Sequence, residues 1–277
     1  MALEQSVARH YTHGSLQAAI FGALEASGKD TDRLAPGDLA SVDEFHIGGR
    51  EATVDFATQL GVRSGLHLLD IGCGLGGAFR YFAHERGCRV TGVDLTEEYV
   101  LTAKTLSERV GLGHLVSYQQ GSALALPFDQ GSFDGAYMLH VGMNIEDKRK
   151  LFSEGRRVLK LGGIFGIYDV MRESSEGDLR FPVPWAASAE TSFVETAATY
   201  RQLLEGADFQ VQSERNRREF AVEFFNQMRA REAQSGGPPA LALHILMGAS
   251  APQKVGNMID NLERGVIAPT EIICRAI

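Results

Sequence analysis

The chain has 277 residues, of which 44% are hydrophobic and 22% charged, and its formal net charge is −8 at pH 7. This length supports one large domain or a domain and a half, with the composition of an ordinary globular protein. The acidic balance argues against a general nucleic-acid binder, and no stretch approaches the roughly 18–20 apolar residues of a membrane span.

The three cysteines, Cys73, Cys88 and Cys274, are odd in number and widely separated. Their spacing predicts neither a disulfide framework nor a metal site, and it favours a reducing compartment. The amino terminus lacks the basic patch and apolar run of a secretory signal. We therefore expect a cytoplasmic protein that binds neither nucleic acid nor membrane and holds no metal.

The chain begins with an expected helical cap segment over residues 1–50, whose most apolar stretch is 15–26. A helix over about 51–60 ends at Gly61, and strand and helix patterns alternate from there. Expected strands and helices follow in turn at 66–70, 78–85, 89–94, 96–110, 115–119, 133–139, 146–159 and 164–169. Such alternation predicts a Rossmann-like α/β fold, with mostly parallel strands and helices on both faces of the sheet.

The alternation ends after residue 169. Residues 170–195, which contain the only tryptophan, Trp185, are expected to form an irregular segment over the strand ends. A helix, a strand, a helical insertion around Gly236-Gly237-Pro238-Pro239 and a closing strand follow at 196–205, 209–213, 216–265 and 270–277. This makes a sheet of seven strands. We expect one domain over residues 51–277, in which 170–195 and 216–265 form a substrate lid.

The loop after the first expected strand satisfies two glycine patterns. Gly72, Gly74 and Gly77 fit the dinucleotide pattern, whereas Gly72, Gly74 and Gly76 fit the alternating pattern of methyltransferases. In both, the missing side chains let the backbone approach a ligand beside a helix amino terminus. Asp94, which ends the next strand, can accept hydrogen bonds from ribose hydroxyls. The glycines alone leave an NAD(P)-dependent oxidoreductase open as an alternative.

Asp70, two places before the first glycine, distinguishes the two patterns. A carboxylate at this strand end would repel a pyrophosphate. Near the amino group of a methionine moiety it would help, either by direct contact or by bracing the amides of the loop. Asp70 therefore favours a cationic sulfonium cofactor.

Five segments in chain order resemble the motifs of class I S-adenosylmethionine-dependent methyltransferases. They are Leu-Leu-Asp-Ile-Gly-Cys-Gly-Leu-Gly at 68–76, Gly-Val-Asp at 92–94, Gly-Ser-Ala with Leu-Pro-Phe at 121–128, Ser-Phe-Asp at 132–134 and Arg-Val-Leu-Lys-Leu-Gly-Gly at 157–163. The resemblance implies S-adenosyl-L-methionine as the cofactor. It also implies a set of cofactor-binding residues: Asp70, Gly72, Gly74, Gly76, Asp94, Leu95, Ser122, Ala123 and Leu139.

One position departs from this family. Its adenine loop usually carries Gly-Asp-Ala, and the carboxylate accepts a hydrogen bond from the adenine amino group. The present chain has Ser122 at that place. A hydroxyl should hold adenine less tightly than a carboxylate, so we expect the backbone of Ala123 to share the contact.

The molecule that accepts the methyl group, here called the acceptor, is expected to bind at the end of the fourth strand. His140 is the candidate for orienting or deprotonating it, with a structural role as the alternative. Tyr168, at the end of the next strand, is a second candidate, and Trp185 could cover a cationic amine or pack in the core. The segment around His46 resembles sarcosine and dimethylglycine methyltransferases, which implies that His46 lines the site; a surface turn is the alternative.

We therefore expect an enzyme that methylates a small organic molecule. An amine is favoured slightly over a hydroxyl or a carbon, on the resemblance to the sarcosine group alone. A cofactor-binding protein without catalytic activity remains an alternative. A homodimer contact through the helical insertion also stays open.

Overall fold

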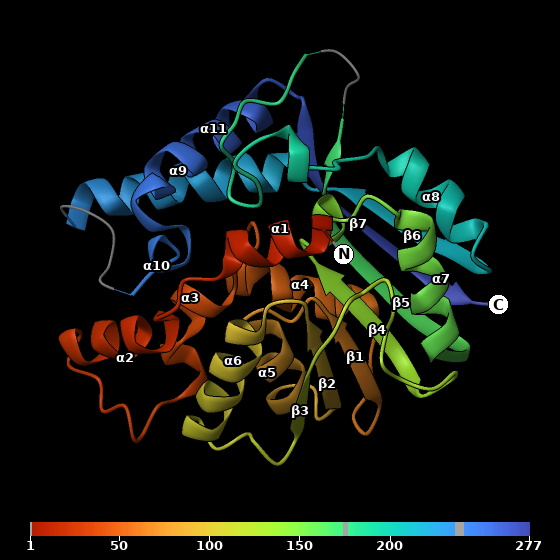
Figure 1. Ribbon diagram of the computed structural model, residues 1–277, viewed down its shortest axis with the longest axis horizontal. Helices are drawn as coiled ribbons and strands as arrows, with labels where there is room; N and C mark the ends of the chain where they lie inside the picture. Colours follow the sequence, from red (N-terminus) through yellow and green to blue (C-terminus); the bar gives the residue numbers. More distant parts are fainter. Residues whose placement is uncertain (1, 174–176, 236–240) are drawn as a thin grey trace.

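A seven-stranded sheet forms the centre of the computed structural model, which describes residues 2–173, 177–235 and 241–277 (Figure 1). The strand order is β3-β2-β1-β4-β5-β7-β6. The strands are β1 (His67–Ile71), β2 (Arg89–Asp94), β3 (Val116–Gln120), β4 (Phe133–Leu139), β5 (Leu159–Arg172), β6 (Phe209–Asn216) and β7 (Ile267–Ala276). The first five strands pair in parallel, and β7 runs antiparallel to β5 and β6. The predicted Rossmann-like, mostly parallel sheet is confirmed.

Helices cover both faces of the sheet because alternate strand residues point to opposite sides. Tyr137 and Tyr168 pack with apolar side chains of α4 (Gly49–Leu60) and α5 (Gly77–His84). Their neighbours on the strands pack on the opposite face, with side chains of α7 (Lys148–Val158) and α8 (Ala197–Glu205). Helix α6 (Glu97–Arg109) packs against β2 and β3. Both faces of β4 and β5 are therefore buried in the core.

Strand β5 is longer than the sequence predicts. It begins at Leu159, directly after α7, and it includes the Gly162-Gly163 pair that was expected to precede a strand over 164–169. A register irregularity between Phe133 and Gly135 on β4 accommodates this start. Beyond residue 169 the strand continues because Val170 and Met171 are buried and pair with β7. Pairing with β7, a strand about 100 residues later, extends β5. The sequence around residue 170 alone therefore does not predict where β5 ends.

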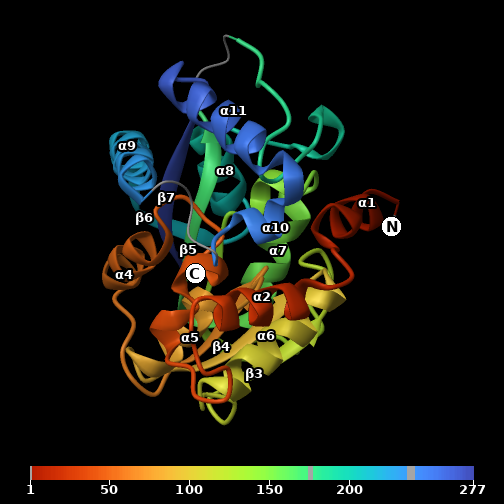
Figure 2. The same cartoon turned by 90° about the vertical axis from the view of Figure 1, so that its left-hand side faces the viewer.

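The remaining helices lie mostly at the carboxyl ends of the parallel strands (Figures 1 and 2). The cap segment contains α1 (Ala2–Tyr11), α2 (Leu16–Ala26), a 3-10 turn (Pro36–Asp38) and α3 (Ala40–Asp43). The insertion before β7 contains α9 (Arg218–Ser235), α10 (His244–Met247) and α11 (Ala251–Glu263). The predicted break at 236–239 lies outside the described residues. None of the helices in the described ranges is both long enough and apolar enough to cross a bilayer.

Candidate active site

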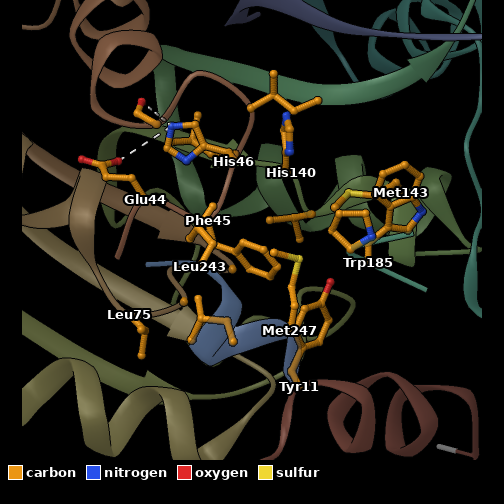
Figure 3. Close-up of a pocket in the computed structure, with 18 of the residues that line it drawn as sticks. Tyr11, Glu44, Phe45, His46, Leu75, His140, Met143, Trp185, Leu243 and Met247 are labelled. Carbon is orange, nitrogen blue, oxygen red and sulfur yellow. Dashed lines mark hydrogen bonds and ion pairs between the residues drawn. The ribbon is translucent and has the colours of Figure 1, made fainter. Parts of the chain in front are cut away.

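A cavity of about 1490 Å³ lies at the carboxyl ends of β1, β2 and β4 (Figure 3). Its walls come from the loops after these strands, from the cap segment, and from α9, α10 and α11. Pockets for a single small ligand usually measure about 300–1,000 Å³. The cavity therefore has room for two ligands side by side.

The glycine loop after β1 is shaped by backbone that only glycine adopts easily. Gly72, Gly74 and Gly76 have φ angles of 76°, 51° and 83°. A side chain at Gly72 would overlap the Cγ2 atom of Val141. The backbone of the loop can therefore lie directly against Val141, just after β4, because glycine has no side chain. Gly72 and Gly74 line the cavity. Gly76 is not among the lining residues and instead faces the guanidinium of Arg80.

Two carboxyl groups flank the loop. Asp94 accepts hydrogen bonds from the backbone N–H of Gly74, at 2.9 Å, and of Thr96, at 2.8 Å. It therefore joins the end of β2 to the glycine loop and to the start of α6. Asp70 is 3% exposed, and burial, with the charges of Asp94 and Glu44, raises its pKa well above its usual value. A cation placed at this point would favour the ionised form of Asp70.

His140 stands at the end of β4 with a φ of 54°, in the left-handed region. Its backbone N–H donates to the carbonyl of Tyr168 at 2.7 Å. The Nε2 atom is closed to solvent, and none of the described residues forms a hydrogen bond with it. Burial, with the neighbouring His46, lowers the pKa of His140 well below its usual value. The imidazole is therefore neutral near pH 7, and the residue lines the cavity.

His46 lies beside His140, with 6.0 Å between the ring centroids, and faces Glu44 on its other side (Figure 3). Its Nε2 is 3.0 Å from the carbonyl of Gly49 and 3.1 Å from Oγ1 of Thr53. The Thr53 hydroxyl donates its proton to Glu44 at 2.7 Å. Both neighbours of Nε2 are thus acceptors, so this nitrogen carries the proton and Nδ1 keeps the lone pair. Burial lowers the pKa of His46 to about 4, so this histidine is also neutral.

The wall opposite the histidines is apolar. Figure 3 shows Phe45, Met143, Trp185, Leu243 and Met247 around the space below the two imidazoles. These side chains come from the cap segment, the end of β4, the segment after β5, and α10 with the residue before it. A ligand on this side of the cavity meets mainly carbon and sulfur atoms.

A chain of hydrogen bonds joins the remote segments that form this wall. The hydroxyl of Tyr11, at the end of α1, donates to Oδ1 of Asn144 at 2.8 Å. The Asn144 amide donates to the carbonyls of Trp185, at 2.8 Å, and Thr191, at 3.0 Å. The sequence does not single out Asn144. Its only signal there is that it is a polar residue five positions after the fourth strand. It holds three parts of the cavity wall together.

Most residues that the sequence singles out do line this cavity. The structure brings together Asp70, Gly72, Gly74, Asp94, Leu95, Ser122, Ala123, Leu139, His140, His46 and Trp185. Tyr168 does not line it: its hydroxyl donates to the carbonyl of Ile47 at 3.0 Å, and the side chain is buried against α4. The sequence does not predict the hydrogen bond from Thr53 to Glu44, because a single buried carboxylate leaves no periodic pattern in a sequence. Nor does it predict the place of Glu4, whose carboxylate accepts a hydrogen bond from Ser122.

Residues 69–167 match the family described as a methyltransferase domain. Over 113 residues the chain is 37% identical to a sterol 24-C-methyltransferase of Gibberella zeae, covering 41% of this chain and 30% of that protein. Over 133 residues it is 30% identical to an O-methyltransferase of Aspergillus sclerotiorum, covering 48% and 50%. The chain thus spans between about a third and a half of the length of these curated relatives.

Solved structures resemble the chain over a larger part of its length. Geranyl diphosphate C-methyltransferase from Streptomyces coelicolor superposes with a TM-score of 0.70 at 16% identity, covering 100% of this chain and 99% of that one. A structure named for a sarcosine dimethylglycine methyltransferase of Galdieria sulphuraria gives a TM-score of 0.65 at 19% identity, covering 81% and 84%. At these identities the likeness establishes a shared fold.

Proposed function

We propose that this chain, which carries a class I S-adenosylmethionine-dependent methyltransferase domain, transfers a methyl group from that cofactor to a small organic acceptor. One observation carries the proposal. A glycine loop flanked by Asp70 and Asp94 opens into the same cavity as a half-buried, neutral His140 and an apolar wall. This arrangement supports a cofactor site and an acceptor site that adjoin at the end of β4.

The residues on the loop side suit S-adenosylmethionine better than a dinucleotide. Asp70 is buried with a raised pKa, so a nearby ammonium group would stabilise its charge. A pyrophosphate at the same place would be repelled by an ionised Asp70. The backbone at Gly72 and Gly74 can approach a ligand closely. We assign Asp94 and Leu95 to the ribose and adenosine, and Asp70, Gly72 and Gly74 to the methionine moiety.

The bound cofactor supplies a methyl group on a sulfonium that is already activated for in-line displacement. The protein contributes mainly position and exclusion of water. His140 is the group best placed to orient the acceptor, or to take its proton where the acceptor is an ammonium or a hydroxyl. Its neutral state leaves it able to accept a hydrogen bond from the acceptor, and its lowered pKa makes orienting the acceptor the stronger of these two roles. His46, held by Thr53 and Gly49, supports the ring of His140 from one side.

We further propose that the cap segment and the described parts of residues 170–195 and 216–265 together cover the acceptor. Each contributes apolar side chains to the same wall, with Phe45, Trp185 and Met228 as examples. This wall supports an acceptor with a largely apolar body, because burying such surface is favourable at about 25 cal/mol per Å². The resemblance to sarcosine methyltransferases supports an amine as the methylated atom. Similarity to proteins named as C-methyltransferases supports a carbon as the second choice.

Methyl transfer into an apolar metabolite extract tests the proposal. The chain is incubated with the extract and with cofactor that is isotopically labelled in the methyl group, and the labelled product is identified by mass spectrometry. We expect a labelled small molecule together with an equal amount of S-adenosylhomocysteine. Cofactor binding without transfer to any fraction would instead indicate a non-catalytic binding protein. A change in nicotinamide fluorescence on mixing with NADH would favour the oxidoreductase.

A further inference from the structure

The loop after β3 contains a contact that the local sequence does not predict. The Ser122 hydroxyl donates a hydrogen bond to the carboxylate of Glu4, a residue 118 positions earlier on α1. The same hydroxyl oxygen accepts from the backbone N–H of Leu124 at 3.0 Å. Both Glu4 and Ser122 line the cavity. The serine is thus engaged as a donor and as an acceptor, and a carboxylate stands next to it.

One face of α1 is directed into the cavity. Leu3, Glu4 and Val7 all line it, and residues at these spacings lie on one side of a helix. The far end of α1 is fixed by Tyr11, which donates to Asn144, and by His10, whose Nε2 is 3.0 Å from the carbonyl of Pro184. The helix is therefore held with its acidic residue over the loop.

The chain immediately after α1 is also anchored. Glu98, in the first turn of α6, accepts hydrogen bonds from the backbone N–H groups of Gly14, at 3.0 Å, and Leu16, at 2.9 Å. Several independent polar contacts thus place the amino-terminal helix. The position of Glu4 is a consequence of that whole arrangement rather than of one contact.

The backbone next to Ser122 offers a complementary group. The N–H of Ala123 donates to none of the described residues, and Ala123 lines the cavity. The adenine edge presents an amino donor beside a ring-nitrogen acceptor. A carboxylate beside a backbone N–H matches that pair. Glu4 and Ala123 together provide this combination.

We propose that Glu4 supplies the carboxylate that receives the adenine amino group, in place of the aspartate that this chain lacks at Ser122. The proposal rests on the proposed cofactor. Ser122 acts as a positioning residue that orients Glu4, and Ala123 donates to the adenine ring. The adenine site is therefore complete only when α1 is docked, so cofactor binding and docking of α1 stabilise each other.

Calorimetric titration of the full chain with two ligands tests this assignment. One ligand is S-adenosylhomocysteine, and the other is S-inosylhomocysteine, in which a carbonyl oxygen replaces the amino group and the neighbouring ring nitrogen carries a proton. Removing a charge-assisted hydrogen bond should weaken binding about tenfold. We expect Glu4→Ala to weaken binding of S-adenosylhomocysteine by that factor and to reduce the preference for adenine over hypoxanthine by at least as much. Gln5→Ala, at an exposed position of the same helix, is the matched control and should change neither value.

A second pair of variants keeps the test decisive if Glu4→Ala folds poorly. Glu4→Gln retains the size of the side chain and should weaken S-adenosylhomocysteine about threefold, since the amide oxygen still accepts without charge. Adding Ser122→Asp to Glu4→Ala should restore most of the affinity. Binding and base preference within twofold of wild type in Glu4→Gln, or in Glu4→Ala where it folds, would overturn the assignment. Failure of the wild-type chain to bind S-adenosylhomocysteine would instead overturn the proposed function.

Discussion

The two sides of the cavity are assembled in different ways. The side that we assign to the cofactor, called the cofactor side, takes most of its groups from one stretch, between Asp70 at the end of β1 and Ala123 after β3. The side that we assign to the methyl acceptor, called the acceptor side, combines the cap segment, the end of β4 and two later segments, and its contact between Tyr11 and Asn144 spans 133 positions. The first side is fixed by local backbone geometry and the second by tertiary contacts. This difference explains why a sequence can identify a methyl donor while leaving its acceptor open.

Arg80 connects the two sides through hydrogen bonds to both. Of the changes considered, its removal should cause the largest loss of free energy. Its buried guanidinium on α5 donates to Asp43 of the cap segment at 2.5 Å and to the carbonyl of Leu75 in the glycine loop at 2.8 Å. Arg80→Met leaves Asp43 buried without its cation. We expect the free energy of unfolding in denaturant melts at pH 7 to fall by about 3–5 kcal/mol.

Arg109→Met is the control for this comparison, because Arg109 pairs with Asp32 at an exposed position. That change should cost less than about 1 kcal/mol. Asp43→Asn added to Arg80→Met should recover part of the loss, because burial and the charge of Glu44 raise the pKa of Asp43 to about 6 even with Arg80 beside it. Equal losses for Arg80→Met and Arg109→Met would show that the pair does not connect the two sides.

The next largest effect is expected on the acceptor side. His140→Asn removes the imidazole, and asparagine tolerates the left-handed backbone at this position. Loss of an acid–base group should lower kcat about 100-fold, equivalent to ~2.7 kcal/mol. Binding of S-adenosylhomocysteine, measured by calorimetry, should stay within twofold. His114→Asn, at an exposed histidine, is the control, and unchanged turnover in His140→Asn would reduce His140 to a packing residue.

A smaller effect is expected on the cofactor side. Asp94→Asn weakens the contacts to Gly74 and Thr96 and removes the charge that we assign to the ribose. We expect S-adenosylhomocysteine to bind about 30-fold more weakly, equivalent to ~2 kcal/mol, because a hydrogen bond to a charged group contributes in that range. The KM of the acceptor should not change. The control is Glu97→Gln, at an exposed position three residues later, which should bind S-adenosylhomocysteine as wild type does. An equal loss of affinity in this control would show that the negative charge of the region, rather than a contact of Asp94, is responsible.

The smallest effect is expected from pH. Burial lowers the pKa of His140 well below its usual value and that of His46 to about 4. Both imidazoles are therefore already neutral at pH 6.5, and protonation begins only as the pH falls further. Turnover at saturating acceptor should change less than about twofold between pH 6.5 and 8. A single ionisation that halves turnover near pH 6.5 would contradict the burial of His140.

The sequence predicts which residues of the glycine loop and of the neighbouring strand ends line one cavity, because its signals there are local. Glycines with positive φ, a carboxylate at the end of each of two strands and ordered motifs all lie within a short stretch. Gly76 shows the limit of this reasoning: its place in the pattern is clear, yet it faces Arg80 rather than the cavity. The length of β5 could not be predicted either, since its end depends on pairing with β7.

The acceptor side is less predictable because its partners are distant. Tyr168 follows His140 by 28 positions at a neighbouring strand end, but its hydroxyl is used by the carbonyl of Ile47. Glu4 carries no motif, and only the folded chain places it against Ser122. The alternation and spacing of hydrophobic residues predict helices and strands, whereas such contacts depend on how the helices and strands pack together.

Calorimetric titration of the wild-type chain with S-adenosylhomocysteine tests the central claim most directly, with NADH as the competing ligand. The glycine loop, Asp70 and Asp94 predict saturable binding of S-adenosylhomocysteine at one site per chain and none of NADH. Saturable binding of NADH, or no binding of S-adenosylhomocysteine, would contradict the account.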